Sequence, residues 1–281
     1  MKEFMKRPLF LLLLALTFCG MQLVAQTKAP ASNSQSQPAN RRPPQAKTQQ
    51  EFKDYNAAYA ITGGEAMEKA ASDFAAKYPE SELRPYLFAK AMHEYQNENN
   101  SPKMLAAGEK VLLVDPDNSV ALVLTATVLA DNLSDGDADR QKKIDEIKKN
   151  SEHALQTIDT ALVSPANATP EQITAYKGTL QSMAHSALGI MALKSADDAG
   201  AEKELKAAAS LNPGPSDPYI WYHLALAQDH QKKYDEAIVS INQALKNTGA
   251  NADLGQLAQS ERERLLLLTK AGATPQTQPP K

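Results

Sequence analysis

The stretch that decides the fold is SMAHSALGIMALKSADDAGAEKELKAAASLNPGPSDPYIWYHLALAQDHQKKYDEAIVSINQALKN, residues 182–247. It holds two consecutive units, one beginning at Ser182 and the next at Pro218, that share one register of apolar residues. In the first unit, positions 4, 7, 8, 11, 20, 24, 27 and 32 are His185, Leu188, Gly189, Ala192, Ala201, Leu205, Ala208 and Pro213. In the second, the first seven of these positions are Trp221, Leu224, Ala225, Gln228, Ala237, Ile241 and Ala244. Small residues at positions 8, 20 and 27 let two helices touch, and larger ones at 4, 7 and 24 fill the space beside them.

This register resembles the tetratricopeptide repeat (TPR), a unit of about 34 residues with the pattern W-x2-L-G-x2-Y, then A-x3-F, then a late proline. The resemblance implies helix–turn–helix hairpins that stack, because one hairpin cannot bury its own apolar face. A generic helical bundle is the alternative. Agreement between two consecutive units over so many positions argues against a chance match.

Weaker copies of the unit precede residue 182. A degenerate first unit runs from about Glu51 to Pro79, and a second closes at Pro116. The second unit departs from the pattern at Met92, Met104 and Gly108, and a third is interrupted by a polar insertion at residues 134–141. Residues 254–270 are typical of a terminal helix that covers the last apolar face. We therefore expect an all-α fold, a right-handed α-solenoid of about five helix–turn–helix (TPR-like) repeats with a C-terminal capping helix.

The first 25 residues have the layout of a secretory signal peptide. Lys2, Lys6 and Arg7 precede an apolar run at residues 8–18, and Val24-Ala25 offers a cleavage site before polar Gln26. An uncleaved anchor helix is the alternative, although the apolar run is short for a membrane span. The layout predicts a periplasmic or secreted protein with no integral membrane segment in the mature chain.

The single cysteine, Cys19, lies within this signal. A lipoprotein signal requires a small residue just before the modified cysteine, and Phe18 stands there, so the pattern disfavours a lipid anchor at Cys19. Cleavage after Ala25 would leave no cysteine, and therefore no disulfide and no cysteine-based metal or nucleophile chemistry.

Low-complexity segments flank the helical region. Residues 26–50 are rich in Pro, Gln and Ala and include Arg41-Arg42-Pro43-Pro44, and residues 272–281 are similar. Such segments bury too little apolar surface to offset the entropy of ordering, so we expect a disordered linker at 26–50 and a disordered tail at 272–281. The repeat domain is then residues 51–271, and the basic pair is interpreted as solvated linker.

Charge and motifs point away from several functions. The net charge of −3 and the pI near 6.0 give no basic face for nucleic acid. The five histidines form no metal-binding motif, and no phosphate-binding, dinucleotide-binding or nucleophile-elbow motif occurs. We therefore predict a protein that is not an enzyme and takes no cofactor and no metal.

In TPR proteins the first helix of each unit lines a groove through positions 2, 5, 9, 12 and 13, and this resemblance implies a partner-binding surface. The residues carried over are Tyr86, His93, Gln96, Asn97, Met183, Tyr219, Tyr222, Asp229 and His230. For Tyr219 and Tyr222, packing between adjacent units is an equal alternative. The predicted function is a non-catalytic scaffold of the cell envelope that binds a peptide or a partner helix. An envelope-assembly or cell-wall factor that binds lipid or glycan through Tyr219 and Tyr222 is the second hypothesis.

Overall fold

A computed structural model describes residues 41–163, 168–211, 217–249 and 251–273. The predicted signal peptide with Cys19, the linker up to residue 40 and the tail from residue 274 lie outside the described residues. All regular secondary structure in the described ranges is α-helical, which confirms the predicted all-α class.

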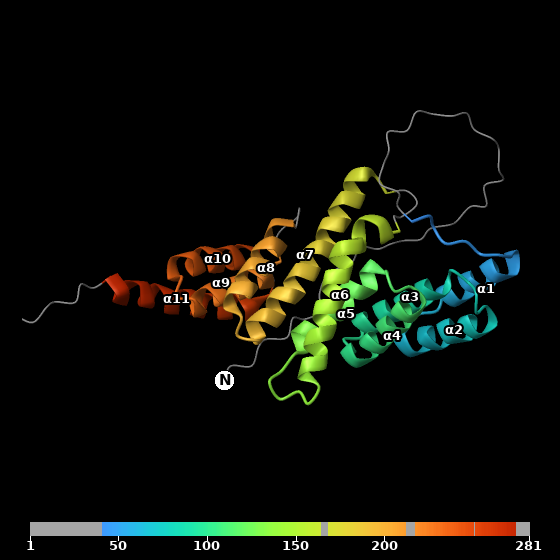
Figure 1. Cartoon of the computed structure of the whole chain (residues 1–281), viewed down its shortest axis with the longest axis horizontal. Coiled ribbons are helices and arrows are strands. Elements are labelled where there is room, and N and C mark those ends of the chain that lie inside the picture. The colour runs from blue at the N-terminus through green and yellow to red at the C-terminus, as the bar shows by residue number, and fades with distance from the viewer. Residues whose placement is uncertain (1–40, 164–167, 212–216, 250, 274–281) are drawn as a thin grey trace, which may run out of the picture. The chain divides into compact units, whose positions relative to one another are not determined.

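The described helices follow one another along the chain, and most are joined by short turns (Figure 1). They are α1 (Gln49–Tyr59), α2 (Gly64–Lys77), α3 (Arg84–Asn97), α4 (Ser101–Val114), α5 (Ser119–Asn132), α6 (Arg140–Ala161), α7 (Pro170–Lys194), α8 (Asp198–Leu211), α9 (Pro218–His230), α10 (Tyr234–Asn247) and α11 (Ala252–Ala273). Taken in pairs from α1 to α10 they give five hairpins, and α11 is the terminal helix. The predicted hairpin repeats with a C-terminal capping helix are thus confirmed.

Three hairpin turns share one conformation. Asn99, Ala196 and Lys232 each have a φ of 54–61°, in the left-handed region, and each stands at position 15 of its unit. The amide of the next residue donates to a carbonyl five residues back in all three turns, as in Asp197 to Ala192 at 2.9 Å. This is the Schellman arrangement of a helix end. The same turn at the same position shows that the three units are copies of one structural repeat.

The small residues of the register mark places where helices touch. A Cβ atom on Gly189 of α7 would lie 2.6 Å from Cγ of Leu205 on α8, a distance that real contacts do not show. Ala201, Ala208 and Ala237 are buried with no exposed surface. Position 8 of this unit is therefore a close helix–helix contact, as the sequence predicts.

Two helices begin earlier than the sequence analysis expects. α7 starts at Pro170, twelve residues before the unit that begins at Ser182, and α1 starts at Gln49 rather than near residue 51. At the start of α7, Thr169 Oγ1 accepts from the amide of Gln172, and Gln172 Oε1 accepts from the amide of Thr169. This reciprocal pair is a capping box, and the run Thr-Pro-Glu-Gln is its sequence signature.

The described residues fall into two compact units. The N-terminal unit holds residues 41–122 and 156–177, and the C-terminal unit holds residues 123–155 and 178–273, within the described ranges. The core of the C-terminal unit includes two clusters, one from α7, α8 and α9 and one from α9, α10 and α11. Trp221 packs against both clusters, so its environment reports on this unit.

Candidate functional site

The groove positions predicted for the last repeat face α11. Tyr219 is only 7% exposed, and the side-chain Nδ2 of Asn251 donates to its hydroxyl at 2.9 Å. Tyr222 is half-buried against the cluster that α11 completes, and Asp229 forms an ion pair with Arg264 of α11. Both tyrosines thus make packing contacts within the C-terminal unit, and their role in partner binding stays a prediction. Tyr219, Tyr222 and Asp229 therefore lie on the side of α9 that packs toward α11 and the turn before it.

Two other predicted residues of the C-terminal unit are His230 and Met183. His230 is exposed at the end of α9, and its Nδ1 lies 2.8 Å from Oδ1 of Asp198 at the start of α8. Met183 is half-buried on α7. These two residues lie at separate places on different helices.

The four predicted residues of the N-terminal unit are on α3. His93 and Asn97 are exposed, and His93 Nδ1 lies 3.2 Å from Oε1 of half-buried Gln96. Tyr86 shares their helix face but lies about 10 Å earlier along the axis, given a rise of about 1.5 Å per residue. It is half-buried, and burial raises the pKa of its phenol to about 12. Tyr86 therefore belongs to a different surface, at the start of α3.

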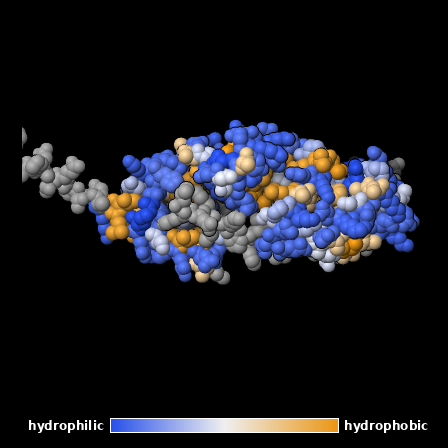
Figure 2. Space-filling view, turned by 90° about the horizontal axis from the view of Figure 1, so that it is seen from below, coloured by the Kyte–Doolittle hydropathy of each residue, from blue (hydrophilic) through white to orange (hydrophobic). Residues whose placement is uncertain are grey.

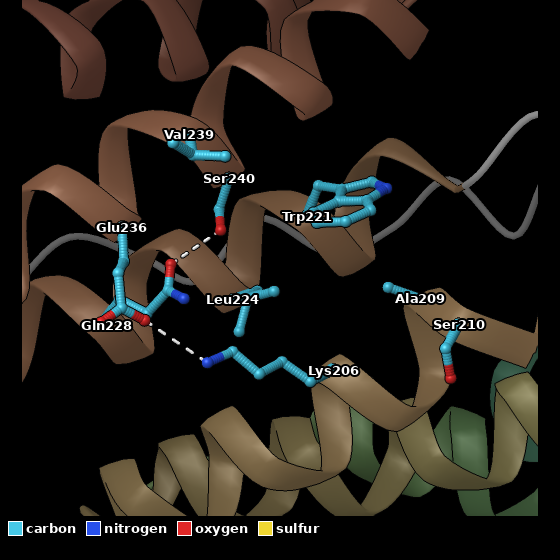
Figure 3. A pocket seen from close by; sticks show the side chains of 9 residues that line it. All are labelled: Lys206, Ala209, Ser210, Trp221, Leu224, Gln228, Glu236, Val239 and Ser240. Carbon is cyan, nitrogen blue, oxygen red and sulfur yellow. Dashed lines mark hydrogen bonds and ion pairs between the residues drawn. The ribbon is translucent and has the colours of Figure 1, made fainter.

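An open apolar cleft of about 400 Å³ lies between α8, α9 and α10 (Figure 3). We call it the Trp221 cleft. Its lining residues are Lys206, Ala209, Ser210, Trp221, Leu224, Gln228, Glu236, Val239 and Ser240. On the face of the molecule that Figure 2 shows, hydrophobic residues form patches within a largely hydrophilic surface.

The Trp221 cleft combines an apolar floor with a few polar groups that are already paired. Trp221 and Leu224 come from α9, and Val239 of α10 is 61% exposed at the edge. Ser240 Oγ donates to Gln228 Oε1 at 2.7 Å, and Lys206 Nζ lies 3.4 Å from the carboxylate of Glu236 (Figure 3). Such a lining suits an apolar side chain that enters between two rim charges of opposite sign.

Sequence reasoning did not find this cleft. The repeat register assigns Trp221, Leu224 and Gln228 to packing positions. These residues are packed on one side, and their other side lines the cleft. The sequence feature that could have indicated the cleft is Val239. It is a large apolar residue at position 22 of its unit, outside the packing register of Ala237, Ile241 and Ala244. An exposed β-branched residue beside the tryptophan of the same unit indicates a surface that no other helix of the repeat array covers.

A second cleft, of about 360 Å³, lies in the N-terminal unit beside residues 41–46, which we call the strap. The lining residues of this strap cleft are Arg41, Arg42, Pro44, Glu80, Ser81, Glu82, Arg84, Pro85, Tyr86, Val114, Asp115 and Val163. Arg41 and Arg42 were expected to be solvated linker. Instead, each is in an ion pair, with Asp115 and Glu82 respectively.

The described residues bring together no group of three or more His, Cys, Asp or Glu side chains in a metal-binding arrangement. None of the helices in the described ranges combines the length and the apolar character required to span a bilayer.

Comparisons with known proteins find a likeness among solved structures alone. No protein-family model matches the chain, and no curated protein matches it. Among solved structures, the crystal structure of a thermophilic TPR protein of Thermus thermophilus is similar to this chain. Its TM-score is 0.46 and its sequence identity 15%, over 75% of this chain and 98% of the other.

Proposed function

We propose that this protein is a non-catalytic scaffold that binds another polypeptide through the Trp221 cleft. The observation that supports the proposal is an open apolar cleft between two adjacent repeats, beside a core cluster that both repeats share. At about 400 Å³ the cleft has the size of a site for one or two anchoring side chains. Aromatic anchors in such pockets carry most of the binding energy of many interfaces.

The preferred partner is a peptide or helix that inserts an apolar side chain between Lys206 and Glu236. The polar groups of the cleft are taken up by structural contacts: Ser240 donates to Gln228, and Lys206 pairs with Glu236 at 3.4 Å and with Glu202 at 2.6 Å. This supports binding rather than catalysis. The lipid- or glycan-binding alternative depended on Tyr219 and Tyr222, which lie against α11, and no feature of the described residues favours it.

A site-specific cross-linking experiment identifies the partner. A photoreactive amino acid replaces exposed Val239, and the matched control carries it at Leu113, which is 83% exposed on α4 in the other unit. We expect envelope extracts to give a protein adduct at residue 239 that is absent at residue 113. Equal adducts at both positions would contradict the proposed cleft.

The purified partner is then titrated against the protein. Trp221 is the only tryptophan of the chain, so its fluorescence reports occupancy of the cleft directly. Val239→Glu places a charge at the apolar edge and should weaken binding by about tenfold or more, since burying an unpaired charge is costly. Leu267→Glu, at an exposed position of α11, should leave the affinity unchanged. Undiminished affinity of the Val239→Glu variant would exclude this surface.

The scaffold is also proposed to act outside the cytoplasm. Residues 1–25 support export, and Phe18 before Cys19 argues against lipidation. Fractionation of tagged cells should recover a soluble periplasmic or secreted form whose first residue is Gln26, and deletion of residues 2–25 should retain the protein in the cytoplasm. An intact N-terminus in the membrane fraction would show an anchor instead.

A further inference from the structure

The strap is bound to the N-terminal unit by two consecutive guanidinium groups. Arg41 Nη1 donates to Oδ1 of Asp115 at 2.5 Å, and its Nη2 lies 3.7 Å from Oδ2 of Asp117. Arg42 Nη2 donates to Oε1 of Glu82, also at 2.5 Å. Each arginine thus has its own carboxylate partner, one at the end of α4 and the other just before α3.

The strap backbone and one proline add to these ion pairs. The amide of Gln45 donates to Oε2 of Glu82 at 3.3 Å, so one carboxylate holds both a side chain and the main chain. Pro44 is buried although the strap has no regular secondary structure. Charge pairs, a main-chain hydrogen bond and a buried proline are the means by which extended peptides are held by their receptors.

The acidic side of this contact is positioned by the repeats themselves. Asp115 is the C-cap of α4, and its side chain also accepts from Nδ2 of Asn118 at 3.2 Å. Glu82 lies in the short turn between α2 and α3, two helices that pack against each other. Asp115 and Glu82 are therefore placed by elements of the repeats that lie outside the strap.

We propose that the strap is an intramolecular ligand, and that the strap cleft binds an extended, dibasic, proline-containing segment of a partner polypeptide in its place. The strap itself defines the chemistry of the segment that would replace it. Such a segment has two adjacent basic residues, which form ion pairs with Asp115, Asp117 and Glu82, followed by prolines. The open volume beside it, with Tyr86 in its wall, leaves room for bulkier side chains than those of the strap.

The geometry also makes the strap displaceable. The side chains of Arg41 and Arg42 are 43% and 64% exposed, and ion pairs this exposed contribute little and are screened by salt. A partner segment competes with a strap that is present at high effective concentration. If the strap is seated about nine-tenths of the time, the partner's apparent affinity is about tenfold lower than for an empty cleft.

The test uses the full chain and a fluorescent peptide with the strap sequence, ANRRPPQAK, followed by anisotropy. In the double variant Arg41→Glu, Arg42→Glu the strap is repelled from the cleft, while every acidic side chain of the cleft stays in place. We expect this variant to bind the peptide about tenfold or more tightly than the wild type does. The milder Arg41→Gln, Arg42→Gln variant should change the affinity in the same direction. Both altered residues are exposed, and circular dichroism confirms that each variant is folded.

Two controls make the result specific. Adding Glu82→Gln and Asp115→Asn to the double variant should abolish binding, and the peptide ANQQPPQAK should not bind any variant. Added peptide should speed hydrogen exchange at the Gln45 amide of the wild type, because the strap is released.

The proposal is overturned if wild type and strap-repelled variant bind the peptide equally, or if the charge-neutralised cleft still binds it. It is also overturned if no variant binds the peptide and the wild type instead self-associates in sedimentation, since the occupant is then a second copy of the chain. The Trp221 cleft lies in the other unit, so these outcomes are independent of the proposed function.

Discussion

At the scale of single residues, position 15 of the repeat carries a conformational cost. Asn99, Ala196 and Lys232 adopt positive φ at the same turn, although left-handed backbone is unfavourable for any residue with a Cβ atom. Asparagine tolerates this region, whereas alanine does not. None of the three turns has a glycine at this position, so their shared conformation was not predictable from residue type. The packing of the two helices in each hairpin imposes it.

Ala196→Gly should therefore stabilise the protein. Relief of the left-handed strain outweighs the entropy that glycine adds to the unfolded chain, for a gain of about 0.5–1 kcal/mol. The matched control is Ala106→Gly in the middle of α4, which should cost about 1 kcal/mol. Urea denaturation of both variants checks the prediction, and a loss of stability in Ala196→Gly would contradict it.

At the scale of helices, the repeat that closes at Pro116 forms its hairpin although it matches the sequence pattern poorly. The reason is that large and small residues exchange positions within it. Met92, Met104 and Gly108 place large residues at positions 8 and 20 and a small one at 24, the reverse of the usual pattern. All three are buried in the N-terminal unit. Cores accept such exchanges when the total volume is kept. The sequence therefore predicts the hairpin but not its detailed packing.

The terminal helix α11 closes the apolar face of α9 and α10. Leu265 has no exposed surface there, whereas Leu267 of the same helix is 68% exposed. Leu265→Ala should cost about 2–5 kcal/mol, since it removes buried methyl groups and leaves a cavity. Leu267→Ala should change stability by less than about 0.5 kcal/mol. Equal effects of the two substitutions, measured by thermal or urea denaturation, would show that α11 does not cap this face.

Glu202 joins α8 to the turn between α9 and α10. Its buried carboxylate lies 2.6 Å from Nζ of both Lys206 and Lys233 and accepts from Gln231. Burial alone would raise the pKa of Glu202, but these hydrogen bonds outweigh it and lower the pKa from 4.5 to about 2. The ionised form is thus favoured in the folded state, and its stabilising effect is present above about pH 4.5 and lost as the pH falls toward about 2.

Glu202→Gln should destabilise the protein by about 1–3 kcal/mol at neutral pH, the range for hydrogen bonds to a charged group. The difference from wild type should shrink between about pH 4.5 and pH 2, because the wild-type carboxyl becomes protonated there. Denaturation at a series of pH values measures this. A difference that stays constant over that range would show that Glu202 is not held ionised by its lysines.

At the scale of the whole molecule, the described residues form two units, and repeat arrays are stabilised mainly by contacts between neighbours. Unfolding then need not be one cooperative step. Trp221 reports on the C-terminal unit alone, whereas far-ultraviolet circular dichroism reports on all helices.

Met67→Ala, at a fully buried position of α2, should lower the stability seen by circular dichroism and leave the Trp221 midpoint nearly unchanged. Leu265→Ala, which is equally buried in the other unit, should lower the Trp221 midpoint. Both variants are unfolded in urea with the two signals recorded together. Equal shifts of the Trp221 midpoint in both variants would show that the units unfold as one.

The sequence by itself determined that the chain folds into helical hairpins, and it determined the register of small and large residues in the last two repeats. These follow from the local periodicity of the helix and from side chains three or four residues apart. Only the tertiary structure decided which helix faces stay open. Whether Tyr219 lines a groove depends on where α11 lies, and whether Arg41 is solvated depends on Asp115, seventy-four residues away. No local pattern encodes such contacts, because they join surfaces whose separation in the chain is set by the packing of every helix between them.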